Sequence, residues 1–208
     1  MTGLLDTLET DMLEKLLRKQ DVISLILSRG KGEVLSWIQR RFERKDVMPD
    51  NSIEPHRPSL NELSFRELML GDEETMSYNN AWGGTVPFPM EDWADWYDHW
   101  IVNTADKRFY RYIKDSSTGE FIGEIAYHYD EGRQIHIADV IVFSPYRNRG
   151  YGSKALKLLC MEAAERGVDV LYDDIAIDNP GISIFLREGF TEEYRTDEII
   201  MLRKDLRA

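Results

Sequence analysis

The hydrophobic positions of the chain change their spacing near residue 57. Before that point, apolar residues recur every three or four positions, which predicts helices between residues 4 and 44, interrupted at the glycines of SRGKG (28–32). The segment 48–59 holds three prolines and shows no periodicity, so it reads as a linker. We therefore predict a helical N-terminal extension and linker over residues 1–57, followed by a separate domain over residues 58–208.

Beyond residue 57, apolar runs of strand length alternate with helical segments. Turn residues in SSTG (116–119) and DEGR (130–133) join the middle strands into hairpins, and one strand–helix–strand crossover follows them. This order predicts a mixed α/β fold with a mainly antiparallel central sheet flanked by helices. The expected strands are 60–69, 108–115, 120–130, 133–143, 168–177 and 198–204, and the expected helices are 72–79, 88–104, 150–166 and 181–188.

The composition narrows the class of protein. With 42% hydrophobic residues among 208, the chain can bury a core, so it is not a disordered protein. Its one cysteine, Cys160, excludes an internal disulfide framework and a multi-cysteine metal cluster. No stretch stays apolar for the roughly 18 residues of a membrane span, and the acidic N-terminus does not resemble a signal peptide. We expect a cytoplasmic protein that holds no metal and binds no membrane.

The net charge of −12 is concentrated in one part of the chain. Residues 58–208 carry 16 Lys and Arg against 28 Asp and Glu, whereas the charges of residues 1–57 cancel. Such a surface repels nucleic acid and favours a cationic small molecule or peptide. The alternative is that the acidic residues serve only solubility.

The segment SPYRNRGYGSKALKLL (144–159) points to a bound anion. Gly150 and Gly152 precede a strongly helical run, so backbone N–H groups at a helix start can approach a phosphate without a Cβ in the way. Arg147, Arg149 and Ser153 add donors. The same glycines satisfy the dinucleotide fingerprint G-x-G-x-x-A, but that motif follows the first strand of a fold, and here it comes late.

Together with a later segment, these residues resemble the GNAT family of N-acetyltransferases. Arg147, Gly150 and Gly152 match its acetyl-CoA signature [R/Q]-x-x-G-x-[G/A]. Asn179 and the pair Gly189-Phe190 match the second signature, and the element order fits from about residue 60 to 204. The resemblance implies the GNAT fold and direct acetyl transfer from acetyl-CoA to an amine. It does not extend to residues 1–57.

The resemblance also implies where the donor binds. The main chain of Ile141, Val142 and Phe143 would receive the pantetheine arm, and Asn179 would lie beside it or beside the acetyl group. A backbone N–H near Val142 would polarise the thioester carbonyl. The pyrophosphate would lie on Arg147, Asn148, Arg149, Gly150, Tyr151, Gly152 and Ser153.

The candidate proton carriers come from the strands. His136 lies where the family often has a catalytic base, and its usual pKa suits neutral pH. Glu124 and His128 share a face of their strand. We expect Glu124 to be a further catalytic group and His128 to contact the acceptor. Asp139 has the opposite phase to His136, so we expect it to be structural. Of the adjacent Asp173 and Asp174, one faces the acceptor, and we choose Asp174.

The general acid is left open by the sequence. Phe185 occupies the position where many relatives carry a tyrosine, and it has no proton to give. Tyr172, Tyr194 or water could replace that tyrosine, or the thiolate could leave unassisted. Phe185 also favours an alternative function, a non-catalytic module that binds acyl-CoA as a regulatory ligand.

The acceptor is expected in the aromatic and acidic segment 78–100. Tyr78 and Trp82 are its candidate substrate contacts, whereas Trp93, Trp96 and Trp100 stand at helical spacing, which more often indicates core. We expect a primary amine of a small molecule or a peptide. The sequence does not decide whether residues 1–57 bind a partner or form a homodimer.

Overall fold

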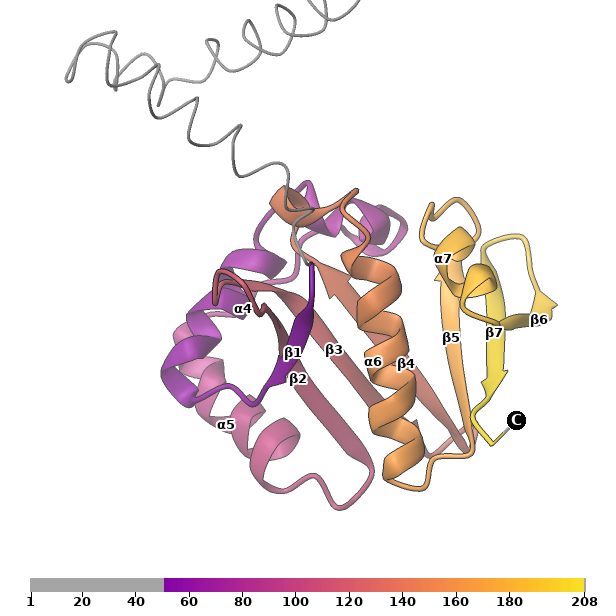
Figure 1. Cartoon of the computed structure of the whole chain (residues 1–208), viewed down its shortest axis with the longest axis horizontal. Coiled ribbons are helices and arrows are strands. Elements are labelled where there is room, and N and C mark those ends of the chain that lie inside the picture. Colours follow the sequence, from indigo (N-terminus) through magenta and orange to yellow (C-terminus); the bar gives the residue numbers. More distant parts are fainter. Residues whose placement is uncertain (1–50, 208) are drawn as a thin grey trace, which may run out of the picture. The chain divides into compact units, whose positions relative to one another are not determined.

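The computed structural model describes residues 51–207, so the predicted N-terminal helices lie outside the described residues. Its centre is a seven-stranded sheet in the order β1-β2-β3-β4-β5-β7-β6 (Figure 1). Every neighbouring pair is antiparallel except β4 and β5, which confirms the mainly antiparallel mixed sheet. The strands are β1 (Ile53–His56), β2 (Arg108–Asp115), β3 (Phe121–Asp130), β4 (Ile135–Val142), β5 (Val170–Ala176), β6 (Thr191–Arg195) and β7 (Ile199–Asp205).

Helices cover both faces of the sheet. The long helix α6 (Tyr151–Glu165) lies across one face, together with the short helix α7 (Ile182–Arg187). The other face carries α4 (Leu63–Leu70) and α5 (Trp93–Tyr97), the latter continuing into the π-helical turn η5 (Asp98–Val102). Three 3-10 turns, η2 (Leu60–Glu62), η3 (Thr75–Trp82) and η4 (Met90–Asp92), connect this layer, and a fourth, η6 (Ser144–Tyr146), follows β4.

Two of the predicted elements are wrong. Residues 60–69, expected as a strand, form η2 and α4, because Ser59 and Glu62 cap the start of the helical segment. The Ser59 hydroxyl donates to Glu62 Oε2 at 2.9 Å. Residues 53–56, expected within a linker, form the edge strand β1, which pairs with β2 from Ile53–Asp115 to His56–Tyr112. The linker interpretation therefore fails for these residues, and the domain boundary at residue 57 stays a prediction.

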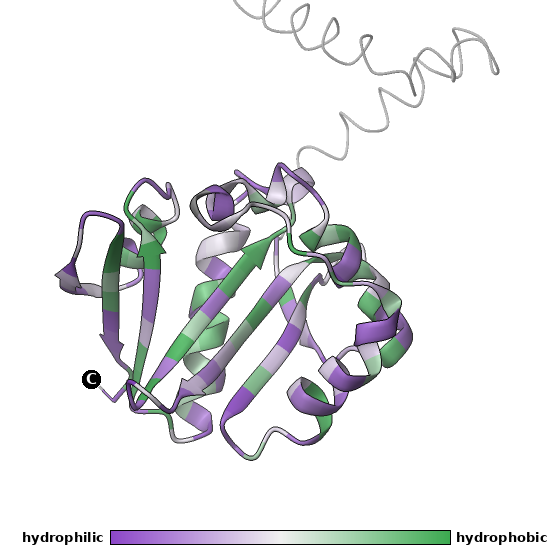
Figure 2. Cartoon of the chain, turned by 180° about the vertical axis from the view of Figure 1, so that it is seen from behind, coloured by the Kyte–Doolittle hydropathy of each residue, from purple (hydrophilic) through white to green (hydrophobic). Residues whose placement is uncertain are grey.

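The core lies between α6 and the sheet. Ala155, Leu156, Leu159 and Ala163 form the buried face of α6 and pack on apolar residues of β2, β3, β5 and β7. Cys160 is buried there, and burial raises the pKa of its thiol. Figure 2 shows apolar residues running along the central strands. Within residues 51–207, no helix combines the length and the hydrophobicity that a membrane crossing needs.

The strands β4 and β5 stay together only over a short distance. Their parallel pairing is limited to His136–Leu171 and Ile137–Tyr172. β4 then continues to Val142 and β5 to Ala176 while the two strands diverge, as Figure 1 shows. The sheet therefore opens between them, at the end where α6 begins.

The turn between β2 and β3 is tied to the start of α6 by Asp115. Its Oδ1 atom accepts the N–H groups of Ser117 at 2.8 Å and Thr118 at 3.0 Å, and its Oδ2 accepts the Tyr151 hydroxyl. Burial favours the neutral acid, but the hydrogen bonds from Ser117, Tyr151 and Thr118 outweigh it and lower the pKa of Asp115 to about 2.

We predict that Asp115→Asn destabilises the fold in a pH-dependent way. Because the folded pKa lies below the unfolded value of about 4, the carboxylate contributes about 2 kcal/mol at neutral pH. That contribution is lost as the pH falls through about 2. Urea unfolding of both proteins should therefore show a difference at pH 7 that shrinks in acid. Asp197→Asn, at an exposed turn, is the matched control. A difference that does not depend on pH would contradict the assignment.

Candidate functional site

The divergence from β5 leaves one edge of β4 without a partner strand within the described residues. Phe143 N–H donates to the Ile122 carbonyl of β3 at 2.9 Å. Neighbouring residues of a strand point their backbone groups in opposite directions. The backbone N–H and C=O groups of Ala138, Val140 and Val142 therefore point toward the gap. The Phe143 carbonyl is also used, by Tyr146 N–H at 2.9 Å. The main-chain groups of Phe143 are thus already hydrogen-bonded, which corrects the expectation that they receive the pantetheine arm. The same alternation directs the backbone groups of Ile141 toward β3.

The loop after β4 leads directly into the N-terminus of α6. Asn148 and Gly150 have positive φ angles of 61° and 83°, and Gly150 is the N-cap of the helix. A Cβ at Gly150 would meet no atom within 4 Å, so this position requires glycine for its φ and not for space. The first-turn N–H groups, which include those of Gly152 and Ser153, lack helical partners and carry the positive end of the helix dipole.

The two arginines of this loop differ in their contacts. The Arg147 guanidinium donates to three backbone carbonyls, those of Val142 at 3.1 Å, Glu74 at 2.8 Å and Thr75. It therefore connects η3 to the end of β4, and its expected contact with the phosphate stays a prediction. The Arg149 guanidinium lies over the Tyr146 ring at 5.8 Å, and the residue is exposed. Its charge is available to an anion.

Two further residues expected to bind the donor have structural contacts. The Tyr151 hydroxyl donates a hydrogen bond to Asp115, which leaves the backbone N–H of Tyr151 as its group for an anion. Asn179 follows β5, and its Oδ1 accepts Gly181 N–H at 2.7 Å where α7 begins. Its Nδ2 group has no protein partner within residues 51–207 and is a donor at the open end of β5.

A cavity of about 330 Å³ lies on the face of the sheet that carries α4 and α5. It unites three residues that the sequence predicted, Tyr78, Glu124 and His128, with Asp139, which was expected to be structural. Ala126 and Asp139 oppose each other in the register of β3 and β4, and both line the cavity. Its walls come from Arg66, Leu70, Met76, Asn79, Val86, Trp96, Trp100, Tyr110 and Ile141.

A buried ion pair forms one side of the cavity. Arg66 Nη1 donates to Glu124 Oε1, and the Tyr110 hydroxyl donates to Glu124 Oε2. The Arg66 guanidinium also stacks on Trp96 at 4.8 Å and on Phe88 at 5.4 Å from the ring centroids. Burial alone would lower the pKa of Arg66, but Glu124 and Tyr110 raise it above its usual value. Both oxygens of Glu124 are thus engaged, which argues against the expected catalytic role.

The acidic group of the cavity that is not paired with an arginine is Asp139. Its Oδ2 lies 3.6 Å from Nδ1 of His128, and its side chain is 49% exposed. Burial, together with the carboxylates of Asp139 and Asp174, raises the pKa of the neighbouring Asp173 well above its usual range. Burial and the charges of Glu124 and Asp139 likewise raise the pKa of Tyr78, so its hydroxyl keeps its proton.

Three expected site residues do not line this cavity. His136 lies on the α6 face of β4, beside the rings of Tyr127 and Tyr129, and burial lowers the pKa of its imidazole. Asp174 is paired with Arg133 at 2.6 Å, and Trp82 is 52% exposed. Phe185 packs in the core against Phe190. Within residues 51–207, no cluster of His, Cys, Asp and Glu is placed to hold a metal ion.

The sequence did contain a signal for Asp139. The turn at residues 131–134 places Asp130 opposite Ile135, and hence Glu124 opposite Ile141. Opposed residues share a face of the sheet. Glu124 and His128 therefore share theirs with Ile137, Asp139 and Ile141, and not with His136. The expected combination of Glu124 and His136 was incompatible with the predicted turn.

Comparisons with known proteins bear on the family and the fold. The profile described as "Acetyltransferase (GNAT) family" matches residues 69–190. A search of curated proteins found no significant match to the sequence. Among solved structures, a spermidine N-acetyltransferase from Vibrio cholerae, in complex with CoA and spermine, is 14% identical with a TM-score of 0.63, over 74% of this chain and 96% of that one.

Two further structures have the same fold. The microcin C7 self-immunity acetyltransferase, in complex with acetyl-CoA and AMP, is 15% identical with a TM-score of 0.58, over 75% of this chain and 93% of that one. The GNAT domain of a protein from S. lividans is 16% identical with a TM-score of 0.59, over 74% of this chain and 89% of that one. The likeness confirms the predicted fold class.

We predict that separating Arg66 from Glu124 is more damaging than removing both charges. Arg66→Met leaves a buried carboxylate without its cation, which typically costs about 3–5 kcal/mol, and Glu124→Gln leaves a buried cation. The double variant should recover part of that loss in urea unfolding. Arg195→Met, which breaks an exposed pair with Glu192, should leave the unfolding midpoint unchanged. Additive losses in the double variant would show that the two residues act independently.

Proposed function

The chain belongs to the acetyltransferase (GNAT) family, and we propose that it transfers the acetyl group of acetyl-CoA to the primary amine of a small molecule or a peptide. The observation that carries the proposal is the position of Asp139. This carboxylate lies on β4, beside the strand edge that has no partner strand within residues 51–207, and it lines a cavity walled by aromatic rings. An amine acceptor needs a base and a cation-binding wall at such a place.

The residues around the gap fit the donor. Backbone groups from Ala138 to Val142 offer the edge of a strand to an extended amide chain, which is the form of a pantetheine arm. The first-turn N–H groups of α6 and the Arg149 guanidinium suit a pyrophosphate. Acetyl-CoA, when bound, supplies a reactive thioester. The N–H of Val142 would donate to the thioester carbonyl oxygen, and the Nδ2 of Asn179 would donate to the arm.

The acceptor side would be served by Asp139 and the aromatic walls. Trp96, Trp100 and Tyr78 offer ring faces to a cation or an apolar body. Arg66 already neutralises Glu124, so Asp139 provides the negative charge that attracts an ammonium group. The spermine in the Vibrio cholerae enzyme belongs to that protein, but it supports an amine here as well.

The reaction needs one proton removed before the new bond can form. Asp139 would take that proton from the ammonium, and His128 beside it would carry the proton toward solvent. The amine nitrogen then bonds to the carbonyl carbon as the carbon–sulfur bond breaks, and the sulfur leaves as a thiolate. The nitrogen releases its second proton to solvent as the amide forms. Tyr78 holds its proton firmly, so it serves as a hydrogen-bond donor and not as the acid. Water would protonate the thiolate.

We predict that Asp139→Asn lowers kcat about 100-fold, the usual scale for loss of a general base, with little change in the KM for acetyl-CoA. His136→Asn is the matched control. His136 lies three residues before Asp139 on β4 but on the α6 face, so this variant should keep near-normal kcat. CoA release with a panel of primary amines measures both. Loss of activity in His136→Asn with retention in Asp139→Asn would overturn the assignment.

We also predict a preference among acceptors. Primary amines that carry an apolar or aromatic body should be acetylated faster than amines of equal charge without one, because the cavity walls are rings. Trp100→Ala should raise the KM for such amines and leave the KM for acetyl-CoA unchanged. Donor binding without CoA release for any amine would instead support a regulatory acyl-CoA module.

A cytoplasmic location stays a prediction.

A further inference from the structure

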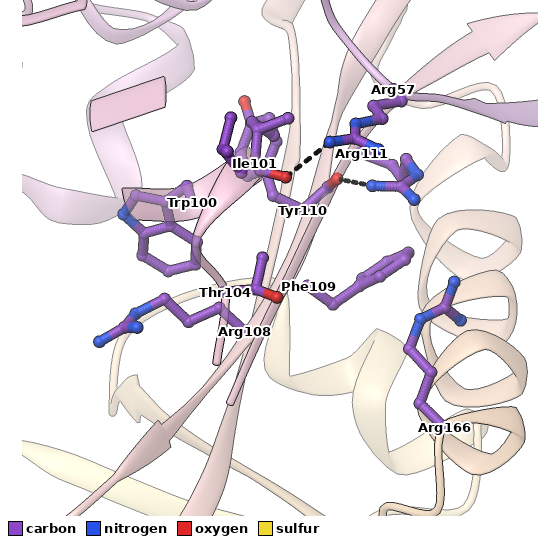
Figure 3. A pocket seen from close by; sticks show the side chains of 10 residues that line it. Arg57, Trp100, Ile101, Thr104, Arg108, Phe109, Tyr110, Arg111 and Arg166 are labelled. Carbon is purple, nitrogen blue, oxygen red and sulfur yellow. Dashed lines mark hydrogen bonds between the residues drawn. The ribbon is translucent and has the colours of Figure 1, made fainter. Parts of the chain in front are cut away.

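A second cavity, of about 240 Å³, gathers arginine side chains on the other side of Tyr110 (Figure 3). Arg111 and Arg166 lie at the ring of Phe109, and Arg57 lies beside Arg111 with its guanidinium directed to the Ile101 carbonyl; we call these three residues the arginine pocket. Arg108 also lines the cavity, but Figure 3 shows its side chain pointing away from the other three. The remaining lining residues are Trp100, Ile101, Val102, Thr104 and Tyr110.

The arginine pocket is separate from the donor site. It lies where β1 ends, so the outer edge of β2 beyond His56–Tyr112 has no strand beside it within the described residues. Arg166 follows the last residue of α6. The loop predicted to hold the donor's pyrophosphate, residues 147–150, precedes the first residue of α6, and we call it the donor loop. Fifteen helical residues, or about 22 Å at 1.5 Å per residue, separate the two ends.

The protein neutralises the charge of this pocket only in part. Arg57 donates to the Ile101 carbonyl at 2.8 Å, and Arg111 donates to the Tyr110 carbonyl at 2.7 Å, so both bind neutral atoms. Arg166 alone has a carboxylate partner, Glu162. Within residues 51–207, the other two form no ion pair, although acidic residues outnumber basic ones in this domain.

The three guanidinium groups repel one another and are held in place nonetheless. Burial, followed by the charges of Arg166 and Arg57, lowers the pKa of Arg111. Arg111 and Arg166 both lie over the Phe109 ring, at 5.0 and 4.4 Å from its centroid. The ring and the two carbonyls fix the donors before any ligand arrives, which reduces the entropy lost on binding. Planar guanidinium forks match the paired oxygens of phosphates and carboxylates.

We propose that the arginine pocket binds a small multivalent oxyanion, such as a phosphate-bearing or polycarboxylate metabolite. Three cations with one internal carboxylate leave an excess positive charge that a single monovalent ion does not balance. The pocket is also open enough to admit a small molecule, at about 240 Å³. An anion there would relieve the repulsion and bridge the edge of β2 to the end of α6.

The test is calorimetric titration of the full chain with pyrophosphate, citrate and acetate at constant ionic strength, in the presence of saturating CoA so that the donor site is already occupied. Pyrophosphate or citrate should bind, and acetate should bind far more weakly. Binding of pyrophosphate alone identifies a phosphate-bearing ligand, and binding of citrate alone identifies a polycarboxylate. Absence of binding by both at millimolar concentration overturns the proposal.

Variants locate the bound anion. Arg111→Gln and Arg57→Gln should each weaken binding about tenfold, the scale of one charge-assisted hydrogen bond. Arg108→Gln removes the same charge from the same strand, and Arg149→Gln removes it from the donor loop, so both should change affinity less than twofold. Equal losses in Arg108→Gln and Arg111→Gln would indicate a general charge effect, and a loss confined to Arg149→Gln would place the anion on the donor loop. Either result overturns the proposal.

The substitutions need a check for folding, because Arg57 and Arg111 also hold backbone carbonyls. Melting in anion-free buffer identifies any variant that fails to fold. Arg111→Lys then replaces Arg111→Gln, because it keeps the charge and loses only the planar fork. It should still weaken pyrophosphate binding, and unchanged affinity in a folded Arg111→Lys protein would contradict recognition by the guanidinium.

Discussion

The short pairing of β4 with β5 is the constraint on which the site depends. Two residue pairs hold these strands together, and beyond Ile137 their facing backbone groups have no strand partner among residues 51–207. Unpaired strand edges are costly when they are buried and prone to aggregation when they are exposed, so a ligand that pairs with this edge would remove both problems. Because α6 starts at the same open end, the helix N-terminus and the strand edge meet there.

The buried pair of Arg66 and Glu124 decides which charges remain for a substrate. An aromatic cage of Phe88, Trp96 and Tyr110 is filled by the chain's own guanidinium. A cationic acceptor therefore cannot use that cage, and Asp139 is left as the acidic contact on the same face. The tryptophan series of α5 divides in a similar way, because Trp93 is buried in the core whereas Trp96 and Trp100 line the cavity.

The strands and helices that were predicted correctly are those whose ends are marked by local sequence patterns. Residues 108–115 were predicted as a strand with the bounds of β2, because SSTG and the alternating pattern define both ends. β6 was missed because all five of its residues are exposed, which leaves no hydrophobic alternation. β1 was missed because it is a four-residue edge strand that contains Pro55. For α4, the S-x-x-E pattern of Ser59 and Glu62 was a helix signal that the apolar residues obscured.

The donor side of the site was easier to predict than the acceptor side because the two use different atoms. Donor binding relies on backbone groups and on glycines that permit them, and these leave a fixed pattern in the sequence. The acceptor side relies on side chains whose position is set by strand register, so an error of one residue exchanges the face of Asp139 for the opposite face, which carries His136 and Ala138. Tyr110 extends this dependence to the arginine pocket, because its hydroxyl holds Glu124 while its carbonyl holds Arg111. One strand position thus orders charged groups on two separate cavities, and neither cavity is visible from the sequence motif.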